Sequence, residues 1–281
     1  MTTRALVLGG GGEAGVAWEV GLLAGLAERG VDLRDADVVI GTSAGAIVGT
    51  LLLSGADLQE LYARQLGPVS APARRVGVDG AAMMAAFGEA LAGATEEREA
   101  RVRLGALALR SASVSEAERR ASTESRIGNP VWPSTRLVVT AVDSADGSLR
   151  TFEAGSGVPL LDAVAASSAA PMFWPPITIG GRRFMDGGMR SPTNADLATG
   201  YDKVLVVAPF AGSADSLLGP DLDEEVARLR ERAEVHVMLA DRTALPAFGP
   251  ALMDPGTREP SARAGRAQAD HAADAVRAFW D

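Results

Sequence analysis

The sequence lacks cysteine entirely and contains only two histidines, His236 and His271. Without cysteine the chain can form no disulfide bond, and no thiolate can act as a nucleophile or metal ligand. The low histidine count also argues against a His-rich metal site. Any reaction that needs an imidazole base would have to use one of these two side chains.

Positive charge is also scarce, because Lys and Arg total 27 against 36 Asp and Glu, for a net charge of −9. This balance argues against a nucleic-acid partner and against electrostatic docking onto anionic lipid. The longest apolar run, residues 44–56, is too short to span a bilayer. The chain does not open on a basic and then apolar signal pattern, so we expect a cytoplasmic protein.

The chain has 281 residues, 47% of them hydrophobic, which is enough for one large α/β domain. Residues 4–8 and 35–40 are typical of short buried strands. Helical spacing follows the first of them and ends near Gly30. This helix carries a stripe of small residues that we expect to pack closely against a sheet: Ala17, Gly21 and Gly25.

The second strand leads into Gly41-Thr42-Ser43-Ala44-Gly45 and then into a long apolar helix. Strand, sharp turn and helix form the context that the nucleophile-elbow motif requires. Gly41 and Gly45 would let the strand and helix approach closely. Ser43 would then lie at a helix N-terminus, whose dipole favours developing negative charge. Taken alone, the five-residue pattern is also typical of an ordinary strand–helix packing turn.

A glycine-rich loop, residues 9–15, follows the first strand. Its Gly10-x-Gly12-x-x-Gly15 spacing matches the dinucleotide fingerprint, which would place a pyrophosphate at the helix N-terminus. That fingerprint needs an acidic residue at the end of the next strand, whereas Asp35 and Asp37 begin it. We therefore favour an oxyanion hole, with consecutive glycine N–H groups facing an oxyanion beside Ser43. A purely structural turn is the third interpretation.

The rest of the chain alternates between helix and strand signals, with one less regular region at residues 67–133. We expect that region to be a helical insertion, either a solvated surface or a cap over Ser43. Asp79 is expected to cap one of its helices, and Ser115 with Glu118 has capping-box spacing. Further strands are expected at 136–142, 148–153, 182–185, 203–207 and 235–239, and further helices at 57–66, 159–165, 221–234 and 257–280. A single domain, residues 1–281, is the simplest account.

A third motif, Asp186-Gly187-Gly188, follows the strand expected at 182–185. A serine hydroxyl is a poor nucleophile until a base takes its proton, and a carboxylate within hydrogen-bond reach can be that base. Because histidine is so scarce, Asp186 is the simplest candidate.

In this order, the three motifs resemble the patatin-like phospholipase family in its bacterial form. The resemblance rests on residues 8–12 with Gly15, on residues 41–45 and on residues 186–188. Residues 166–171, the prolines at 175 and 176, Asn194 and the strand around Leu205 continue it. It covers most of the chain, although residues 67–130 and the C-terminal tail match only loosely.

The resemblance implies a three-layer α/β/α fold with a mostly parallel sheet, and lipid acyl hydrolase activity of the phospholipase A or lysophospholipase type. It implies Ser43 as the nucleophile and Asp186 as the base, with no metal or organic cofactor. It assigns the oxyanion hole to three glycines: Gly10, Gly11 and Gly12. The implied partner is a lipid or fatty-acyl ester, met through transient contact with a membrane surface.

One position departs from the family pattern. Family loops usually carry Arg or Lys two positions after the last consecutive glycine, where this chain has Ala14, preceded by Glu13. Together with the negative net charge, this favours neutral esters, or lipids presented without charge attraction.

Two alternatives use the same residues differently. An α/β-hydrolase with a Ser–Asp–His triad would need His236 or His271, but that fold places several strands before its nucleophile. Only one strand and one helix fit before residue 38. A non-catalytic nucleotide-binding module would use the glycine loop alone.

Overall fold

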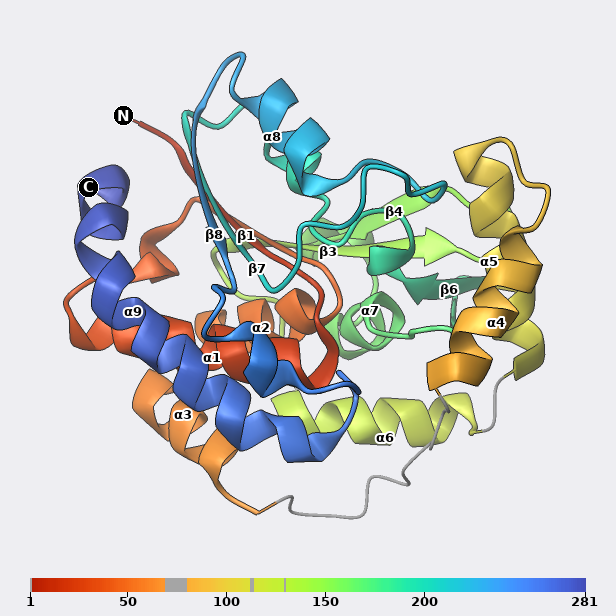
Figure 1. Cartoon of the computed structure of the whole chain (residues 1–281), viewed down its shortest axis with the longest axis horizontal. Helices are drawn as coiled ribbons and strands as arrows, with labels where there is room; N and C mark the ends of the chain where they lie inside the picture. Colours follow the sequence, from red (N-terminus) through yellow and green to blue (C-terminus); the bar gives the residue numbers. More distant parts are fainter. Residues whose placement is uncertain (1, 69–79, 112–113, 129) are drawn as a thin grey trace.

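A mixed sheet forms the centre of the molecule (Figure 1). The computed structural model describes residues 2–68, 80–111, 114–128 and 130–281. Within these residues the sheet has eight strands in the order β5-β6-β3-β2-β1-β7-β8, and β4 pairs with β3 beside that path. The strands are β1 (Arg4–Leu8), β2 (Val38–Gly41), β3 (Arg136–Asp143), β4 (Leu149–Phe152), β5 (Ile177–Ile179), β6 (Arg182–Asp186), β7 (Lys203–Ala208) and β8 (Glu234–Leu239).

Five of these strands, β1, β2, β3, β7 and β8, pair in parallel with one another. The other three, β4, β5 and β6, pair antiparallel at one end of the sheet. The prediction of an α/β fold around a mostly parallel sheet is therefore confirmed.

Helices cover both faces of the sheet. They are α1 (Gly12–Glu28), α2 (Ala44–Leu53), α3 (Leu58–Leu66), α4 (Gly80–Leu91), α5 (Glu97–Ser111), α6 (Glu116–Ile127), α7 (Leu160–Ser167), α8 (Leu222–Leu229) and α9 (Arg258–Trp280). Most of them lie on one face, while α8 packs on the other and α5 packs against Val142 of β3 and Met185 of β6 on that same second face (Figure 1). Successive strand residues point to opposite faces. Leu6 and Val39 accordingly join the core beneath α1 and α2, while Val7 and Val38 pack with α8.

The second strand begins later than the sequence predicted. Residues Leu33–Asp35 form a short 3-10 helix, because the Asp32 side chain accepts a hydrogen bond from the Arg34 N–H at 3.0 Å. The strand itself is Val38–Gly41. The helix expected at 221–234 likewise ends at Leu229, since Glu234 already pairs with Lys203 in the sheet.

The small-residue stripe of α1 packs against α9, so the prediction that it faces the sheet is wrong. A Cβ added to Gly21 would lie 2.0 Å from the Ala262 carbonyl oxygen, and one on Gly25 would lie 2.6 Å from the Ala269 Cβ. The contact is reciprocal, because a Cβ on Gly265 of α9 would lie 2.1 Å from the Trp18 carbonyl oxygen. The two helices thus touch backbone to backbone.

Residues 67–133 contribute α4, α5 and α6. The capping box at Ser115 and Glu118 is confirmed, whereas Asp79 lies outside the described residues. Helix α6 contacts α2 and α7, while α4 and α5 lie toward the β6 end of the sheet (Figure 1). No helix in the described ranges is long and apolar enough to cross a membrane.

Candidate active site

The turn after β2 holds Ser43 in a strained backbone conformation. Its φ of 54° and ψ of −110° lie in a region that residues with a side chain seldom adopt. The turn is also tight, because a Cβ on Gly45 would lie 2.0 Å from the Leu8 carbonyl oxygen. This is the strand, turn and helix geometry expected of a nucleophile elbow, with half-buried Ser43 at the start of α2.

The sheet register brings Asp186 to the same place. Strand β3 pairs with β2 up to Val139 and with β6 from Ala141. Strand β4 pairs with residues 139–142 of β3, so it occupies one edge of β3 while β2 and β6 share the other. The C-terminal ends of β2 and β6 therefore meet along one edge of β3. The Ser43 Oγ donates a hydrogen bond to Asp186 Oδ2 at 2.8 Å.

Asp186 is a buried carboxyl, only 4% exposed. Burial raises its pKa to about 6, while the hydrogen bonds from Ser43 and Gly188 and the positive charge of Arg119 act in the opposite direction. Its second oxygen, Oδ1, accepts the Gly188 N–H at 2.7 Å. This bond fixes the carboxyl with Oδ2 toward Ser43.

The glycine loop lies beside Ser43, as expected from the parallel pairing of β1 with β2. A Cβ added to Gly10 would lie 3.4 Å from the Ser43 Cβ. The Gly10 N–H donates to the Pro192 carbonyl at 2.7 Å, so in this conformation it is not free to face an oxyanion. The N–H groups of Gly11 and Gly12 have no acceptor within the described part of the chain. These two donors lie at the N-terminus of α1.

The loop position where the family usually has a cation is buried. Ala14 is 0% exposed, and the side chain of Glu13 pairs with Arg126 of α6. The positive charge next to this loop therefore comes from α6 and is already matched by a carboxylate.

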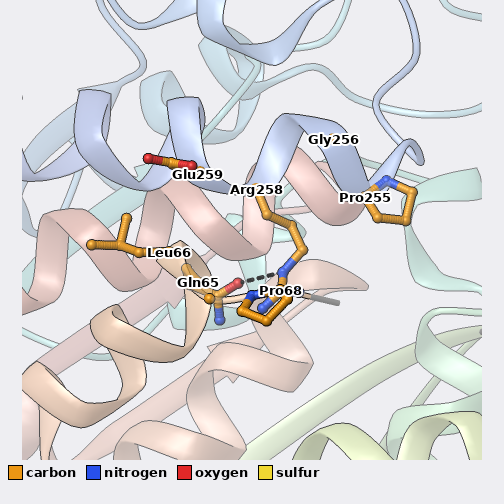
Figure 2. A pocket seen from close by; sticks show the side chains of 8 residues that line it. Gln65, Leu66, Pro68, Pro255, Gly256, Arg258 and Glu259 are labelled. Atoms are coloured by element: carbon orange, nitrogen blue, oxygen red, sulfur yellow. Dashed lines mark hydrogen bonds between the residues drawn. The ribbon is translucent and has the colours of Figure 1, made fainter. Parts of the chain in front are cut away.

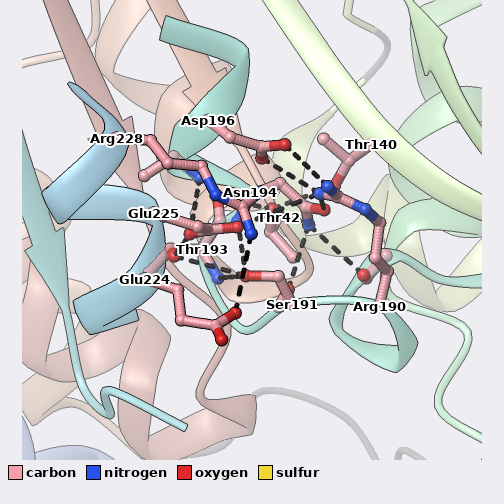
Figure 3. Close-up of polar contacts among 12 residues, drawn as sticks. Thr42, Thr140, Arg190, Ser191, Thr193, Asn194, Asp196, Glu224, Glu225 and Arg228 are labelled. Carbon is pink, nitrogen blue, oxygen red and sulfur yellow. Dashed lines mark hydrogen bonds and ion pairs between the residues drawn. The ribbon is translucent and has the colours of Figure 1, made fainter. Parts of the chain in front are cut away.

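A buried polar network contacts the chain next to Ser43 and Asp186 (Figure 3). Asn194 Nδ2 donates to Thr42 Oγ1 at 3.1 Å and to the Gly187 carbonyl at 3.3 Å, and so contacts the chain neighbours of Ser43 and of Asp186. Asn194 has a left-handed backbone with φ of 49°, which Asn adopts more readily than most residues. Thr42 in turn lies 2.9 Å from Thr140, Oγ1 to Oγ1.

A second layer supports this network. Glu225 Oε2 accepts the Thr193 hydroxyl and the Ala195 N–H, and burial raises the Glu225 pKa to about 7. Arg190 pairs with Asp196 at 2.6 Å. Sequence reasoning noted Asn194 as part of the family likeness but did not identify these buried partners.

The family model for patatin-like phospholipase matches residues 6–199. The chain belongs to the patatin-like phospholipase family. The matched region contains the glycine loop, the Ser43 turn and Asp186. The lipid acyl hydrolase class that the sequence predicted is supported by this membership.

Solved structures of two bacterial proteins show a distant similarity to this chain. VipD from Legionella pneumophila is 13% identical with a TM-score of 0.46, over 98% of this chain and 67% of VipD. ExoU of Pseudomonas aeruginosa, in its complex with SpcU, is 15% identical with a TM-score of 0.37, over 95% of this chain. The chain spans 52% of that ExoU chain. No curated protein matches.

Neither histidine of this patatin-like chain contacts Ser43 or Asp186. His236 lies on β8, half-buried, with its ring 5.4 Å from that of Phe279, and burial lowers its pKa. His271 is exposed on α9. Asp186 instead accepts the Ser43 hydroxyl directly, and no hydrogen bond joins either histidine to it. The geometry therefore does not favour a Ser–Asp–His triad.

A shallow hollow lies elsewhere, between the end of α3 and the start of α9 (Figure 2). Arg258 crosses it and donates from Nε to Gln65 Oε1 at 3.1 Å. Neither Ser43 nor Asp186 lines this hollow. It is therefore separate from the candidate site.

Proposed function

We propose that this chain hydrolyses fatty-acyl esters of lipids, with Ser43 as the nucleophile and Asp186 as the base. One observation carries the proposal: the hydroxyl of a strained serine donates at 2.8 Å to a buried carboxyl. A general base must lie within hydrogen-bond reach of the proton that it removes, and its pKa works best near the operating pH. Burial brings the Asp186 pKa to about 6, toward that range.

The proposed reaction has two steps. Ser43 Oγ attacks the ester carbonyl carbon while its proton moves to Asp186 Oδ2, and the departing alkoxide then takes that proton as the alcohol leaves. Asp186 next accepts a proton from water, whose oxygen attacks the acyl-serine ester. Release of the fatty acid returns the proton to Ser43.

The negative charge on the carbonyl oxygen needs donors near Ser43. In the proposed site these are the N–H groups of Gly11 and Gly12, which lack other acceptors, while the Gly10 N–H is held by Pro192. A well-placed donor of this kind lowers the barrier by about 3–4 kcal/mol. Helices α1 and α2 also begin beside Ser43, and helix N-termini favour negative charge.

We expect neutral esters, or lipids presented without charge attraction, to be preferred over strongly anionic ones. Arg126 is paired with Glu13, Arg119 is only 2% exposed, and the chain carries a net charge of −9. An anionic headgroup would therefore find little uncompensated positive charge here. Contact with a membrane surface would be transient and would rest on the lipid substrate itself. We further propose a cytoplasmic location.

The first prediction tests the two residues. Ser43→Ala should abolish hydrolysis of p-nitrophenyl esters and labelling by a fluorophosphonate probe, while the free energy of unfolding changes by about 1 kcal/mol or less. Asp186→Asn keeps the side-chain shape but cannot take the proton, so it should lose most of kcat.

Matched controls come from the exposed loop after β7, where Ser213→Ala and Asp215→Asn should leave activity unchanged. Labelling of a folded Ser43→Ala protein would contradict the proposed nucleophile. Near-normal kcat in Asp186→Asn would contradict the proposed base. Tight binding of NAD or a nucleotide by calorimetry, with no hydrolysis, would instead support the nucleotide-binding alternative.

A further inference from the structure

A three-residue segment at the end of α7 contacts the main chain of both reacting residues. The Ser43 N–H donates to Ser167 Oγ at 3.0 Å. The Asp186 N–H donates to the Ala169 carbonyl at 3.1 Å. Ser43 and Asp186 come from different strands, so this segment is a shared support for them. A shift of the segment would change their separation.

Arg119 of α6 binds the middle of that segment. One terminal nitrogen of its guanidinium donates to the Ser168 carbonyl at 2.9 Å and to Ser168 Oγ at 2.5 Å. The guanidinium carbon lies 4.4 Å from the centre of the Trp174 ring, within the range of a cation–π contact. A cation at the C-terminus of α7 is also favoured by the helix dipole.

Arg119 is unusual because it is buried without a carboxylate partner at bonding distance. It is 2% exposed, and its Nε has no hydrogen-bond partner in the described part of the chain. Burial of such a charge is unfavourable unless the surroundings compensate for it. An arginine whose only role was to join α6 to α7 would not need to have its charge buried.

We propose that Arg119 is a positioning residue, which holds the Ser167–Ala169 segment so that Ser43 and Asp186 stay at hydrogen-bonding distance. The inference rests on the proposed function of these two residues. The Arg119 charge has a second effect, because it lowers the Asp186 pKa and opposes the effect of burial.

Charged residues on β3 and β6 and just after β6 form ion pairs with one another. On β3 and β6, Asp143 pairs with Arg182, and after β6, Arg190 pairs with Asp196. The positive charge of Arg119 lowers the Asp186 pKa. Loss of the Arg119 charge should therefore raise the pH at which Asp186 becomes deprotonated.

The next residue of α6 supplies a matched control. Arg120 also joins α6 to α7, through Asp162 at 2.6 Å, and it donates to the Thr178 carbonyl at 3.1 Å. It does not contact the segment that supports Ser43 and Asp186. Arg120→Met thus reproduces the loss of an arginine between these helices without the proposed positioning role.

The experiment compares Arg119→Met, Arg119→Lys and Arg120→Met with the wild type, in kcat, KM, pH profile and thermal unfolding. A displacement of about 1 Å in a catalytic site can lower the rate on the order of 100-fold, so Arg119→Met should lose about that factor in kcat with KM little changed. Its acid limb should move to higher pH. Arg119→Lys keeps the charge but not the planar guanidinium that lies over the Trp174 ring, so its limb should stay in place while kcat falls about tenfold.

Ser167→Ala gives an independent check, because it removes the acceptor of the Ser43 N–H. If Arg119 acts through this segment, the losses of kcat in Arg119→Met and Ser167→Ala should not multiply in the double variant. If Arg119→Met does not fold, wild-type kcat in Arg119→Lys would overturn the inference.

Failure of the positioning role can be distinguished from failure of the proposed function. An active wild type in which Arg119→Met matches Arg120→Met overturns the positioning role alone. A wild type without esterase activity or probe labelling contradicts the proposed function, and the positioning role with it.

Discussion

Asp186 sets the expected pH dependence of the reaction. The carboxyl can accept the Ser43 proton only when it is ionised, and burial raises its pKa to about 6. We predict that kcat/KM for a p-nitrophenyl ester rises with pH, with a midpoint near 6. A midpoint near 4, the ordinary value for an aspartate, would contradict the buried environment.

The same pKa shift predicts a dependence of stability on pH. The folded protein holds the Asp186 proton up to about pH 6, whereas an unfolded aspartate loses it near pH 4. Between these values the folded state binds more protons, so the contribution of Asp186 to the free energy of unfolding falls as pH rises. Asp186→Asn has no carboxyl to titrate at this position, so it removes this fall in the free energy of unfolding with rising pH.

Asp186→Asn should therefore gain stability over the wild type as the pH rises from 4 to 7, by about 2–3 kcal/mol. Urea denaturation at several pH values measures this difference. Asp215→Asn, on an exposed loop, is the control for loss of one negative charge. A difference between Asp186→Asn and wild type that does not change with pH would contradict the shifted pKa.

The strain at Ser43 gives a third prediction. With φ of 54° the residue occupies a backbone region that glycine tolerates and alanine does not. Both Ser43→Gly and Ser43→Ala should be inactive, but Ser43→Gly should be the more stable by about 1 kcal/mol. Thermal unfolding of the two variants measures this difference, and equal stability would argue against strain in the elbow.

At the residue scale, the sequence predicted the two side chains of the proposed reaction, Ser43 and Asp186, but not the residues that hold them in place. Ser43 and Asp186 stand next to glycines in short motifs, and the scarcity of histidine favoured a carboxylate base. Arg119 lies in a charged helix that reads as solvated surface, yet it is buried. A buried charge is visible only once its partners are placed, so no local signal could identify it.

At the scale of elements, the site depends on where β2 and β6 end. Both strands pair with one edge of β3, so their ends meet and carry Ser43 and Asp186 together. The order strand, loop, helix predicted that the glycine loop and the Ser43 turn lie side by side, because the carboxyl ends of neighbouring parallel strands lie at the same edge of a sheet. The antiparallel pairing of β6 was not predicted, since short strands separated by loops do not specify their direction.

The contact between α1 and α9 was not predicted either, because a stripe of small residues indicates close packing but not which element packs against it. It gives the fourth prediction. Gly21→Ala would place a methyl group 2.0 Å from the Ala262 carbonyl oxygen and force the helices apart, so the free energy of unfolding should fall by about 2–3 kcal/mol. Denaturant unfolding measures the change.

Gly88 of α4 is the matched control for this substitution, because it is also a helical glycine but has nothing within 4 Å of an added Cβ. Gly88→Ala should leave stability unchanged or raise it by about 0.5–1 kcal/mol. Equal effects of the two substitutions would mean that α1 and α9 do not touch as closely as the structure indicates.

At the scale of the whole molecule, the residues of the candidate site gather where β1, β2 and β6 end. Both histidines lie away from that place. The glycine loop, the Ser43 turn and the end of β6 converge there. His236 lies on edge strand β8 and His271 on the outer helix α9. A variant without histidine should therefore keep its esterase activity.

The fifth prediction uses the double variant His236→Ala, His271→Ala, which removes every histidine from the chain. If Ser43 and Asp186 act alone, kcat should stay within about tenfold of wild type, or about 1.4 kcal/mol of barrier. A modest loss of thermal stability is expected, because His236 packs against Phe279. A histidine base, by contrast, contributes several orders of magnitude to kcat.

The pH profile of this histidine-free protein separates the two kinds of base most sharply. An ordinary histidine and the buried Asp186 would both titrate near pH 6, so the wild-type limb alone does not identify the group. In the double variant only a carboxyl can produce that limb, and we expect it to persist at the same pH. A folded double variant whose activity fell to the Ser43→Ala level would overturn the Ser43–Asp186 pair in favour of a triad.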